Sequence, residues 1–264
     1  RREGIDLVLT GSIESSGKGY TIKTWTLYPT KSEKITEVFQ EITEKSEVLK
    51  ETYKLANQLA SKLGGVKLRY KSHITTTSLE AMNAYSKAYS LEHLGKEQEA
   101  IQEYLRAIQE DPRFGKAYHN LAVVYYNIGQ IQKAIESFEM AMAQLDRMTE
   151  KEMNAIRSSY YLLIGNYKRA IESISAQLKY DPLRRANLAL AYFFTRDMKK
   201  AVEEGKRALE LAPKEVYPRY NLVWYAMGAG DFELADKEAR TLLNQNPEFA
   251  DGYVCFALLE LIQG

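Results

Sequence analysis

A period of about 34 residues organises the greater part of this chain of 264 residues. Five alanines, each at the start of a short amphipathic run, lie 34, 36, 31 and 34 residues apart, at Ala100, Ala134, Ala170, Ala201 and Ala235. Five residues before them stand Gly95, Gly129, Gly165, Arg196 and Gly230. Twelve residues after them stand Pro112, Asp146, Pro182, Pro213 and Pro247. The pattern predicts a helix, a glycine turn, a second helix and a stop, repeated along the chain.

The segment 115–148 shows the repeated pattern most fully. It carries Tyr118, Leu121, Ala122, Tyr125, Ala134, Phe138 and Ala141 at the recurring positions. This pattern resembles the tetratricopeptide repeat, and the resemblance covers about residues 81–264. It implies repeats at about 81–114, 115–148, 151–184, 182–215 and 216–249, and a half repeat at 250–264.

The resemblance implies a mainly α fold, an α-solenoid built from helix-turn-helix repeats. Small residues in the first helices let the second helices approach closely, and they are Ala88, Ala122, Ala189 and Ala257. Stacked pairs bury apolar faces that no single pair can bury, and they wind into a right-handed superhelix with a concave groove. Because three residues are missing near Pro182, we expect the first helix of the fourth repeat to start late and to lack its bulky anchor.

A glycine-rich stretch, GSIESSGKGY at residues 11–20, lies before the repeats. A phosphate-binding loop of the GxxxxGK[ST] type needs four residues between its glycines and a hydroxyl residue after the lysine. Here five residues separate Gly11 from Gly17, and Gly19 stands where the hydroxyl is needed. Alternating apolar residues on both sides predict a β-hairpin instead. The predicted strands are residues 5–14, 19–28 and 34–42.

An amphipathic helix is predicted to follow these strands from about Ser46, with Ala56 and Leu59 among the residues of its apolar face. Gly64 and Gly65 are expected to end it. The strands and this helix resemble the second half of the small α/β domain at the amino terminus of TolB-like and FlgO-like proteins. The predicted organisation is therefore a partial TolB-N-terminal-like domain at 1–66, a linker at 67–78 and the repeats at 79–264.

The join HITTTSLEAMNAYS places Thr77 and Glu80 as a capping box at the start of the repeats. It resembles the entry into the repeats of bacterial receptor-type serine/threonine kinases. The resemblance implies a fragment of a multidomain signalling protein, in which any kinase activity would lie in a part absent from this chain. It also implies an extracytoplasmic, periplasmic part of a membrane-anchored bacterial protein, with a cytoplasmic location as the alternative.

Composition argues against several classes of function. The 36 Lys and Arg nearly balance the 35 Asp and Glu, so no net field favours nucleic acid or an anionic membrane. No apolar run is long enough to predict a membrane span. His73, His93 and His119 lack the spacing of a helical metal pair, and no base lies near Cys255 in the sequence. We expect no catalytic site, no metal and no cofactor.

The first helices carry an aromatic-rich set at the positions that face the groove in tetratricopeptide repeats. The predicted peptide-binding residues are Tyr85, Tyr89, His119, Asn120, Val123, Tyr126, Asn127, Asn187, Phe193, Tyr220, Asn221, Trp224 and Met227. The amides of Asn120, Asn187 and Asn221 are expected to hydrogen-bond the backbone of an extended peptide. Tyr89, Tyr126 and Trp224 are the expected anchors, at positions that repeat packing does not require.

These patterns predict a non-enzymatic scaffold or sensor module that binds a protein or peptide segment in its concave groove. The alternative is a structural or assembly module whose groove or C-terminal helix mediates self-association. The last predicted helix, 250–263, is apolar nearly all round. We expect Phe256, Leu259 and Ile262 to need a cover, either from a second copy in a homodimer or from further residues.

Overall fold

The computed structural model describes residues 8–17, 19–28, 34–63 and 75–263. The predicted helix stop at Gly64 and Gly65 and most of the predicted linker lie outside these residues. Contacts divide the chain into two compact units, residues 1–149 and 150–264. This division falls inside the region predicted to form one repeat domain, so the domain boundaries stay a prediction.

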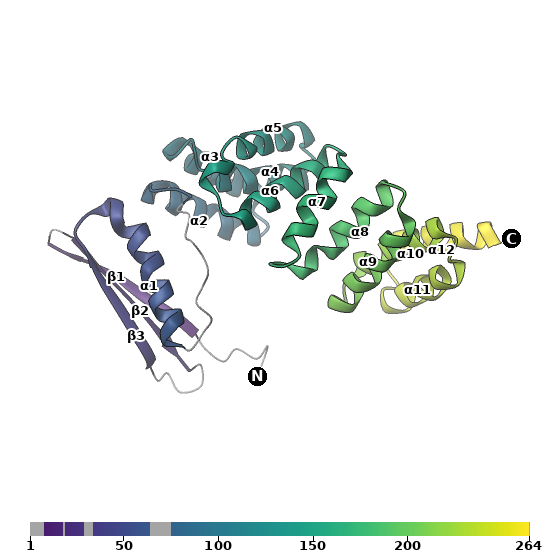
Figure 1. Ribbon diagram of the computed structural model, residues 1–264, viewed down its shortest axis with the longest axis horizontal. Coiled ribbons are helices and arrows are strands. Elements are labelled where there is room, and N and C mark those ends of the chain that lie inside the picture. Colours follow the sequence, from purple (N-terminus) through teal and green to yellow (C-terminus); the bar gives the residue numbers. More distant parts are fainter. Residues whose placement is uncertain (1–7, 18, 29–33, 64–74, 264) are drawn as a thin grey trace. The chain divides into compact units, whose positions relative to one another are not determined.

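The first unit begins with a small antiparallel sheet (Figure 1). Its strands follow one another in the order β1 (Val8–Ser16), β2 (Gly19–Leu27) and β3 (Lys34–Ile42). Ser16 pairs with Gly19 across a tight turn in which Gly17 has a φ of +56°. The glycine-rich stretch is thus a β-hairpin, as its alternating flanks predict.

One helix, α1 (Val48–Lys62), follows the short 3-10 helix η1 (Lys45–Glu47) and packs against β2 and β3. The residues buried between the sheet and this helix are Ile22, Val38, Ile42, Val48, Leu55 and Leu59. Leu59 is on the buried face as predicted, whereas Ala56 is exposed and Leu55 is buried in its place. The prediction was wrong for Ala56, because Leu55 lies four residues before Leu59 and so shares its side of the helix.

Helix pairs occupy the rest of the described chain. In the first unit they are α2 (Leu79–His93) with α3 (Glu97–Glu110) and α4 (Gly115–Asn127) with α5 (Ile131–Met142), followed by the 3-10 helix η2 (Leu145–Arg147). In the second unit they are α6 (Glu150–Leu163) with α7 (Tyr167–Gln177), α8 (Arg185–Phe194) with α9 (Met198–Leu211), and α10 (Val216–Ala229) with α11 (Phe232–Gln245), before the single helix α12 (Ala250–Gln263). The predicted fold class, mainly α with a small antiparallel sheet, is confirmed.

The repeated alanines lie where the two helices of each pair meet. Ala100, Ala134, Ala170, Ala201 and Ala235 are all fully buried. Ala88, Ala122 and Ala189 in the first helices are also fully buried, but Ala257 is exposed. Ala257 lies on α12, which no second helix follows among the described residues. The small side chain is therefore enclosed only where a partner helix is present.

Two local predictions concern helix starts. Helix α8 begins at Arg185 after the 3-10 helix η3 (Pro182–Arg184), so the late start predicted for this repeat is confirmed. The capping box predicted for α2 is wrong by one residue. The N-cap is Ser78, whose Oγ accepts a hydrogen bond from the Ala81 amide at 3.1 Å, while Thr77 precedes the cap. Both residue types can cap a helix, so the sequence alone does not separate them.

Arginine replaces the usual glycine in one of the turns. Gly95, Gly129, Gly165 and Gly230 adopt left-handed φ values between 68° and 77°. Arg196 holds the same conformation with a φ of 64°. A residue with a Cβ pays about 1 kcal/mol or more for this conformation, so the repeat geometry is imposed on Arg196 by the helices on either side.

Replacing Arg196 with glycine should therefore stabilise the protein by about 0.5–1 kcal/mol, because the strained conformation is natural for glycine. Gly129→Ala is the matched opposite change, since a Cβ there would contact nothing within 4 Å and only the backbone conformation is penalised. Urea unfolding of both variants measures the effect. A loss of stability in Arg196→Gly would contradict this account of the turn.

Two ion pairs, one half-buried and one buried, recur at the repeat spacing in the second unit. Arg185 pairs with Glu204, and 34 residues later Arg219 pairs with Glu238. Both arginines occupy the position that Tyr118 holds in the repeat 115–148. The side chains of Arg219 and Glu238 are only 11% and 10% exposed. The missing bulky anchor predicted for the fourth repeat is thus replaced by a salt bridge between the two helices of the pair.

Removing one member of the second pair should be costly, since it leaves a buried charge without its partner. We expect Glu238→Ala to lower the free energy of unfolding by about 3 kcal/mol, and the added change Arg219→Met to recover much of that loss. Asp236→Ala, which removes an exposed pair with Arg240, is the control and should change little. Equal effects for Glu238→Ala and Asp236→Ala in urea unfolding would refute a buried role for the pair.

Candidate functional site

The predicted binding residues all lie on the first helices of the pairs, but they belong to different units. In the first unit α2 carries Tyr85 and Tyr89, and α4 carries His119, Asn120, Val123, Tyr126 and Asn127. In the second unit α8 carries Asn187 and Phe193, and α10 carries Tyr220, Asn221, Trp224 and Met227. Each set therefore forms a surface of its own unit.

A hydrogen-bond network joins the helices of the first unit. The Asn120 amide nitrogen donates to the hydroxyl oxygens of Tyr85 and Tyr104, each at 3.1 Å. The Tyr104 hydroxyl donates to Glu92 Oε2 at 2.6 Å. Burial of the Tyr104 ring, and then its bond to the Glu92 carboxylate, raise the pKa of this phenol above its usual range. The hydroxyl therefore keeps its proton and remains a donor.

This network corrects the prediction for two residues. Tyr85 is buried, with its ring centroid 5.1 Å from that of Phe114, so it supports the surface instead of contacting a ligand. The Asn120 amide nitrogen is occupied by the two tyrosines, and only its carbonyl oxygen is left for a peptide backbone. The sequence did not reveal this, because the partners of Asn120 lie 16 and 35 residues away.

Two predicted anchors are exposed on the first unit. Tyr89 is 47% exposed and Tyr126 is 54% exposed. The centroid of the Tyr89 ring lies 6.4 Å from that of Tyr85, in a stacked arrangement, and 4.2 Å from that of His93. The His93 ring is fixed in turn, since its Nδ1 lies 2.8 Å from the Tyr89 carbonyl oxygen. Contacts with Tyr85 and His93 thus hold the Tyr89 ring in place, and nearly half of its surface stays exposed to solvent.

We call the side chains Tyr89, His93, Val123, Tyr126 and Asn127 the α2–α4 surface. Val123 is half-buried and Asn127 is exposed. His93 was not among the predicted binding residues, although its place four residues after Tyr89 on one helix is a signal that could have found it. The predicted residue His119 is half-buried, with its ring 5.7 Å from Phe138, so it belongs mainly to the packing beneath this surface.

The aromatic residues of the second unit serve packing more than the prediction assumed. Phe193 is half-buried, and its ring lies 5.3 Å from that of Tyr225. Trp224 and Tyr220 meet edge to face at 6.3 Å. Both residues, with Met227, pack against the buried cluster around Val223 and Cys255 that joins α10, α11 and α12. The expectation that Trp224 lies outside the packing is therefore wrong.

The two asparagines of the second unit remain open to a ligand. Asn187 on α8 and Asn221 on α10 occupy equivalent positions 34 residues apart, and both are half-buried. Neither side chain has a hydrogen-bond partner among the residues that the structure describes. Each amide can therefore offer both a donor and an acceptor.

The single thiol of the chain lies in the interior of the second unit. Cys255 is fully buried, and burial raises the pKa of its thiol to about 11, which leaves little thiolate at neutral pH. Within the described ranges, no group of three or more His, Cys, Asp or Glu side chains could hold a metal ion. None of the helices described is both long and apolar enough to cross a membrane.

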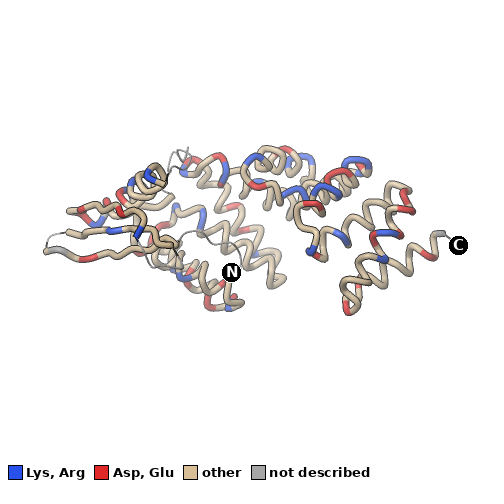
Figure 2. The backbone as a smooth tube through the Cα atoms, turned by 90° about the horizontal axis from the view of Figure 1, so that it is seen from below, with Lys and Arg blue, Asp and Glu red and all other residues tan. Residues whose placement is uncertain are grey.

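Charge is finely mixed along the chain. Figure 2 shows Lys and Arg interleaved with Asp and Glu on the helices of both units. Several of these charges pair across elements, as Lys87 of α2 does with Glu103 of α3 and as Arg113, between α3 and α4, does with Asp146 of η2. Aromatic and amide groups, more than charge, therefore distinguish the first-helix surfaces.

Comparison with known families agrees with this architecture. Models described as the tetratricopeptide repeat match residues 81–114, 103–136 and 185–215. These segments are tetratricopeptide repeats. They contain the pair α2–α3, helix α4 and the pair α8–α9. The aromatic α2–α4 surface thus lies on a repeat-forming part of the chain.

Two relatives match parts of this chain. A TPR repeat-containing protein of Methanocaldococcus jannaschii is 26% identical over 135 residues, covering 47% of this chain and 24% of that protein. The peroxisomal targeting signal receptor of Candida glabrata is 40% identical over 70 residues, covering 26% of this chain and 12% of that protein. The chain thus spans less than a quarter of the length of these relatives.

Solved structures show the same fold at low identity. MamA, residues 41 to the end, from Desulfovibrio magneticus RS-1 superposes with a TM-score of 0.51 and 16% identity, covering 66% of this chain and 98% of that one. YrrB, described as a TPR protein with an unusual peptide-binding site, superposes with a TM-score of 0.50 and 15% identity, covering 66% and 90%. These likenesses concern the fold alone.

Proposed function

We propose that this chain is a protein-binding module that holds an extended or helical segment of a partner on its first-helix surfaces. The observation that carries the proposal is the pair of exposed tyrosines on the α2–α4 surface, Tyr89 and Tyr126. A tyrosine side chain loses little conformational entropy on binding and offers both an apolar ring and a hydroxyl. Exposed aromatic rings on a rigid scaffold are therefore suited to anchor a partner.

The structure supports a rigid site on the first unit. The network from Asn120 through Tyr85 and Tyr104 to Glu92 fixes α2, α3 and α4 against one another. Because Tyr89 rests on Tyr85, the anchor is preorganised before a partner arrives. Asn127 on this surface can then hydrogen-bond backbone groups of the bound segment.

Two further considerations favour binding over catalysis. The one thiol is buried and kept protonated, and the tyrosines with raised pKa lie inside the repeats. A related fold, YrrB, is described as having a peptide-binding site. We propose a peptide-binding role for this chain too, through the residues of its own α2–α4 surface.

We infer further that the chain is part of a bacterial receptor-type serine/threonine kinase, with the kinase activity in another part of that protein. The order of the elements supports this, since three strands and a helix precede the repeats, and their sequence resembles the second half of the TolB-like and FlgO-like domain. In this proposal the chain is the extracytoplasmic, periplasmic sensor or scaffold part of a membrane-anchored protein. A cytoplasmic location is the alternative.

A second candidate function is self-association through α12. Its exposed apolar residues form a stripe along one side of the helix, Tyr253, Val254, Leu258, Leu261 and Ile262. The expected stripe was partly different, since Leu259 is fully buried and Phe256 is half-buried against α11 and α10. Ile262 alone of the three expected residues is exposed. The stripe favours an assembly role in which a second copy covers α12.

The main proposal can be tested with peptides from a random phage library that are selected for binding to the wild-type chain. We expect Tyr89→Ala and Tyr126→Ala each to weaken the selected peptide by about 2 kcal/mol, roughly 30-fold in Kd, because each removes an exposed anchor. Their melting temperatures should stay near that of the wild type. Tyr217→Ala, which removes an exposed tyrosine on the second unit, is the matched control.

Calorimetric titration of the three variants gives the result. Unchanged affinity in both Tyr89→Ala and Tyr126→Ala would contradict the α2–α4 surface as the site, as would a library that yields no peptide. Trp224→Ala is unsuitable for this purpose because its indole packs against the core joining α10 to α12.

A further inference from the structure

Strand β1 carries apolar side chains that point to the α1 side of the sheet but are exposed to solvent. Ile13 lies opposite Ile22, and Leu9 lies opposite Thr26. Ile22 and Thr26 are buried on the side that α1 covers, so Ile13 and Leu9 point to that same side. Leu9 is nevertheless 63% exposed and Ile13 is 62% exposed. The reason is that α1 packs against β2 and β3 and leaves β1 open.

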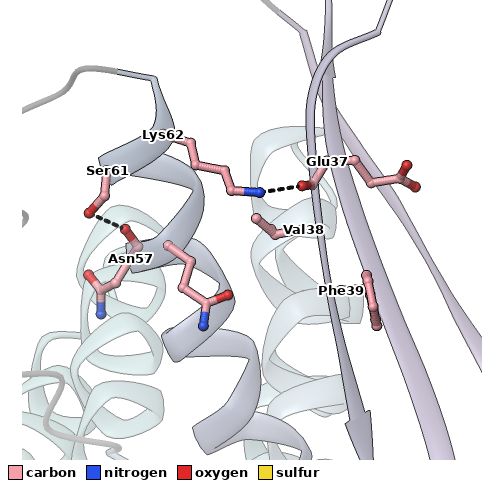
Figure 3. Close-up of a pocket in the computed structure, with 7 residues that line it drawn as sticks. Glu37, Val38, Phe39, Asn57, Ser61 and Lys62 are labelled. Atoms are coloured by element: carbon pink, nitrogen blue, oxygen red, sulfur yellow. Dashed lines mark hydrogen bonds between the residues drawn. The ribbon is translucent and has the colours of Figure 1, made fainter.

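The two edge strands of the sheet, β1 and β3, differ in how they are protected against pairing with another chain. On β3, Lys62 reaches from α1 and donates its Nζ hydrogen to the Glu37 carbonyl oxygen at 3.0 Å (Figure 3). A lysine over an edge strand is a common guard against pairing with another chain. Strand β1 pairs with β2 and with no other strand in the part of the chain that the structure describes. Its nine residues contain neither lysine nor proline.

We propose that β1 pairs with β1 of a second copy of this chain in antiparallel fashion, centred on Gly11. This register places Leu9 of one copy opposite Ile13 of the second copy, and Ile13 opposite Leu9. Both apolar pairs then lie on the α1 side of the sheet, where each side chain covers the other. The contact is isologous, because the same strand supplies both halves.

Charge favours this direction of pairing. The one charged residue of β1 is Glu14, which forms an ion pair with Lys23 at 3.0 Å within its own sheet. A parallel, in-register pair would place Glu14 beside Glu14 of the second copy, and like charges at such positions destabilise a sheet. In the antiparallel register Glu14 faces Val8 of the second copy, and the two carboxylates lie about 20 Å apart.

The centre of the register also fits. Gly11 lies between Leu9 and Ile13 on the α1 side and carries no side chain, so the two strands meet without a steric obstacle at the axis. Pairing joins the two sheets into one of six strands, with both α1 helices on the same face. Leu9 and Ile13 of both copies then form one apolar cluster between those helices.

Light scattering coupled to gel filtration tests the proposal on the whole chain. The wild type should be a dimer, and Ile13→Lys should weaken it by at least about tenfold, because a lysine placed on the apolar side loses its hydration. Phe39→Lys is the matched control, because Phe39 is 65% exposed on β3, follows the buried Val38 and so lies on the opposite face, and this change should leave the dimer intact. Circular dichroism melts show that each variant is folded.

A cysteine cross-link tests the register. Thr10 should lie opposite Ser12 of the second copy, with Cα atoms about 5 Å apart, within disulfide reach. Mixed Thr10→Cys and Ser12→Cys chains should therefore cross-link on oxidation, and each variant alone should not. The native Cys255 is fully buried and does not interfere.

Two results would overturn the proposal. One is a wild type that stays monomeric at every concentration measured. The other is a dimer that survives Ile13→Lys but is lost in Leu261→Lys, since that result assigns the contact to α12. The peptide-binding test on the α2–α4 surface is independent of both, so its outcome leaves this proposal unchanged.

Discussion

The close approach of paired helices at small side chains is the constraint on which the repeat region depends. The five alanines that mark the period are fully buried, and so are three of the four alanines on the first helices. A larger residue at such a crossing would push the helices apart, because interiors are packed at the density of crystals. The turns follow from this requirement, since a short left-handed link returns the chain onto the preceding helix.

The same constraint explains how the chain departs from its own pattern. Arg196 adopts the glycine conformation because the helices around it fix the geometry of the turn. Arg185 and Arg219 replace a bulky anchor, and each compensates with a glutamate on the second helix. Buried charge of this kind is weak evidence for high stability, but it fixes which side chains face one another. The helix pairs tolerate these exchanges because the alanine crossings remain.

Much of the fold could be predicted from the sequence because its signals are local. The hairpin follows from alternating residues around Gly17, and the late start of α8 follows from three missing residues. The candidate site was harder to predict, since burial of Tyr85 depends on Phe114 and on the amide of Asn120. Packing of Trp224 likewise depends on a cluster that includes Cys255 of α12. Position within a repeat gives the face of a helix, but a partner far along the chain decides whether that face is free.

The helix crossings also connect the fold to the proposed function, because they hold α2 and α4 in the register that presents Tyr89 and Tyr126. Urea unfolding of Ala122→Leu and Ala257→Leu tests this central claim most directly. The two alanines occupy equivalent positions, but Ala122 is fully buried and Ala257 is exposed. The account predicts a loss of about 2 kcal/mol or more for Ala122→Leu and a change within about 0.5 kcal/mol for Ala257→Leu. Equal effects of the two substitutions would contradict it.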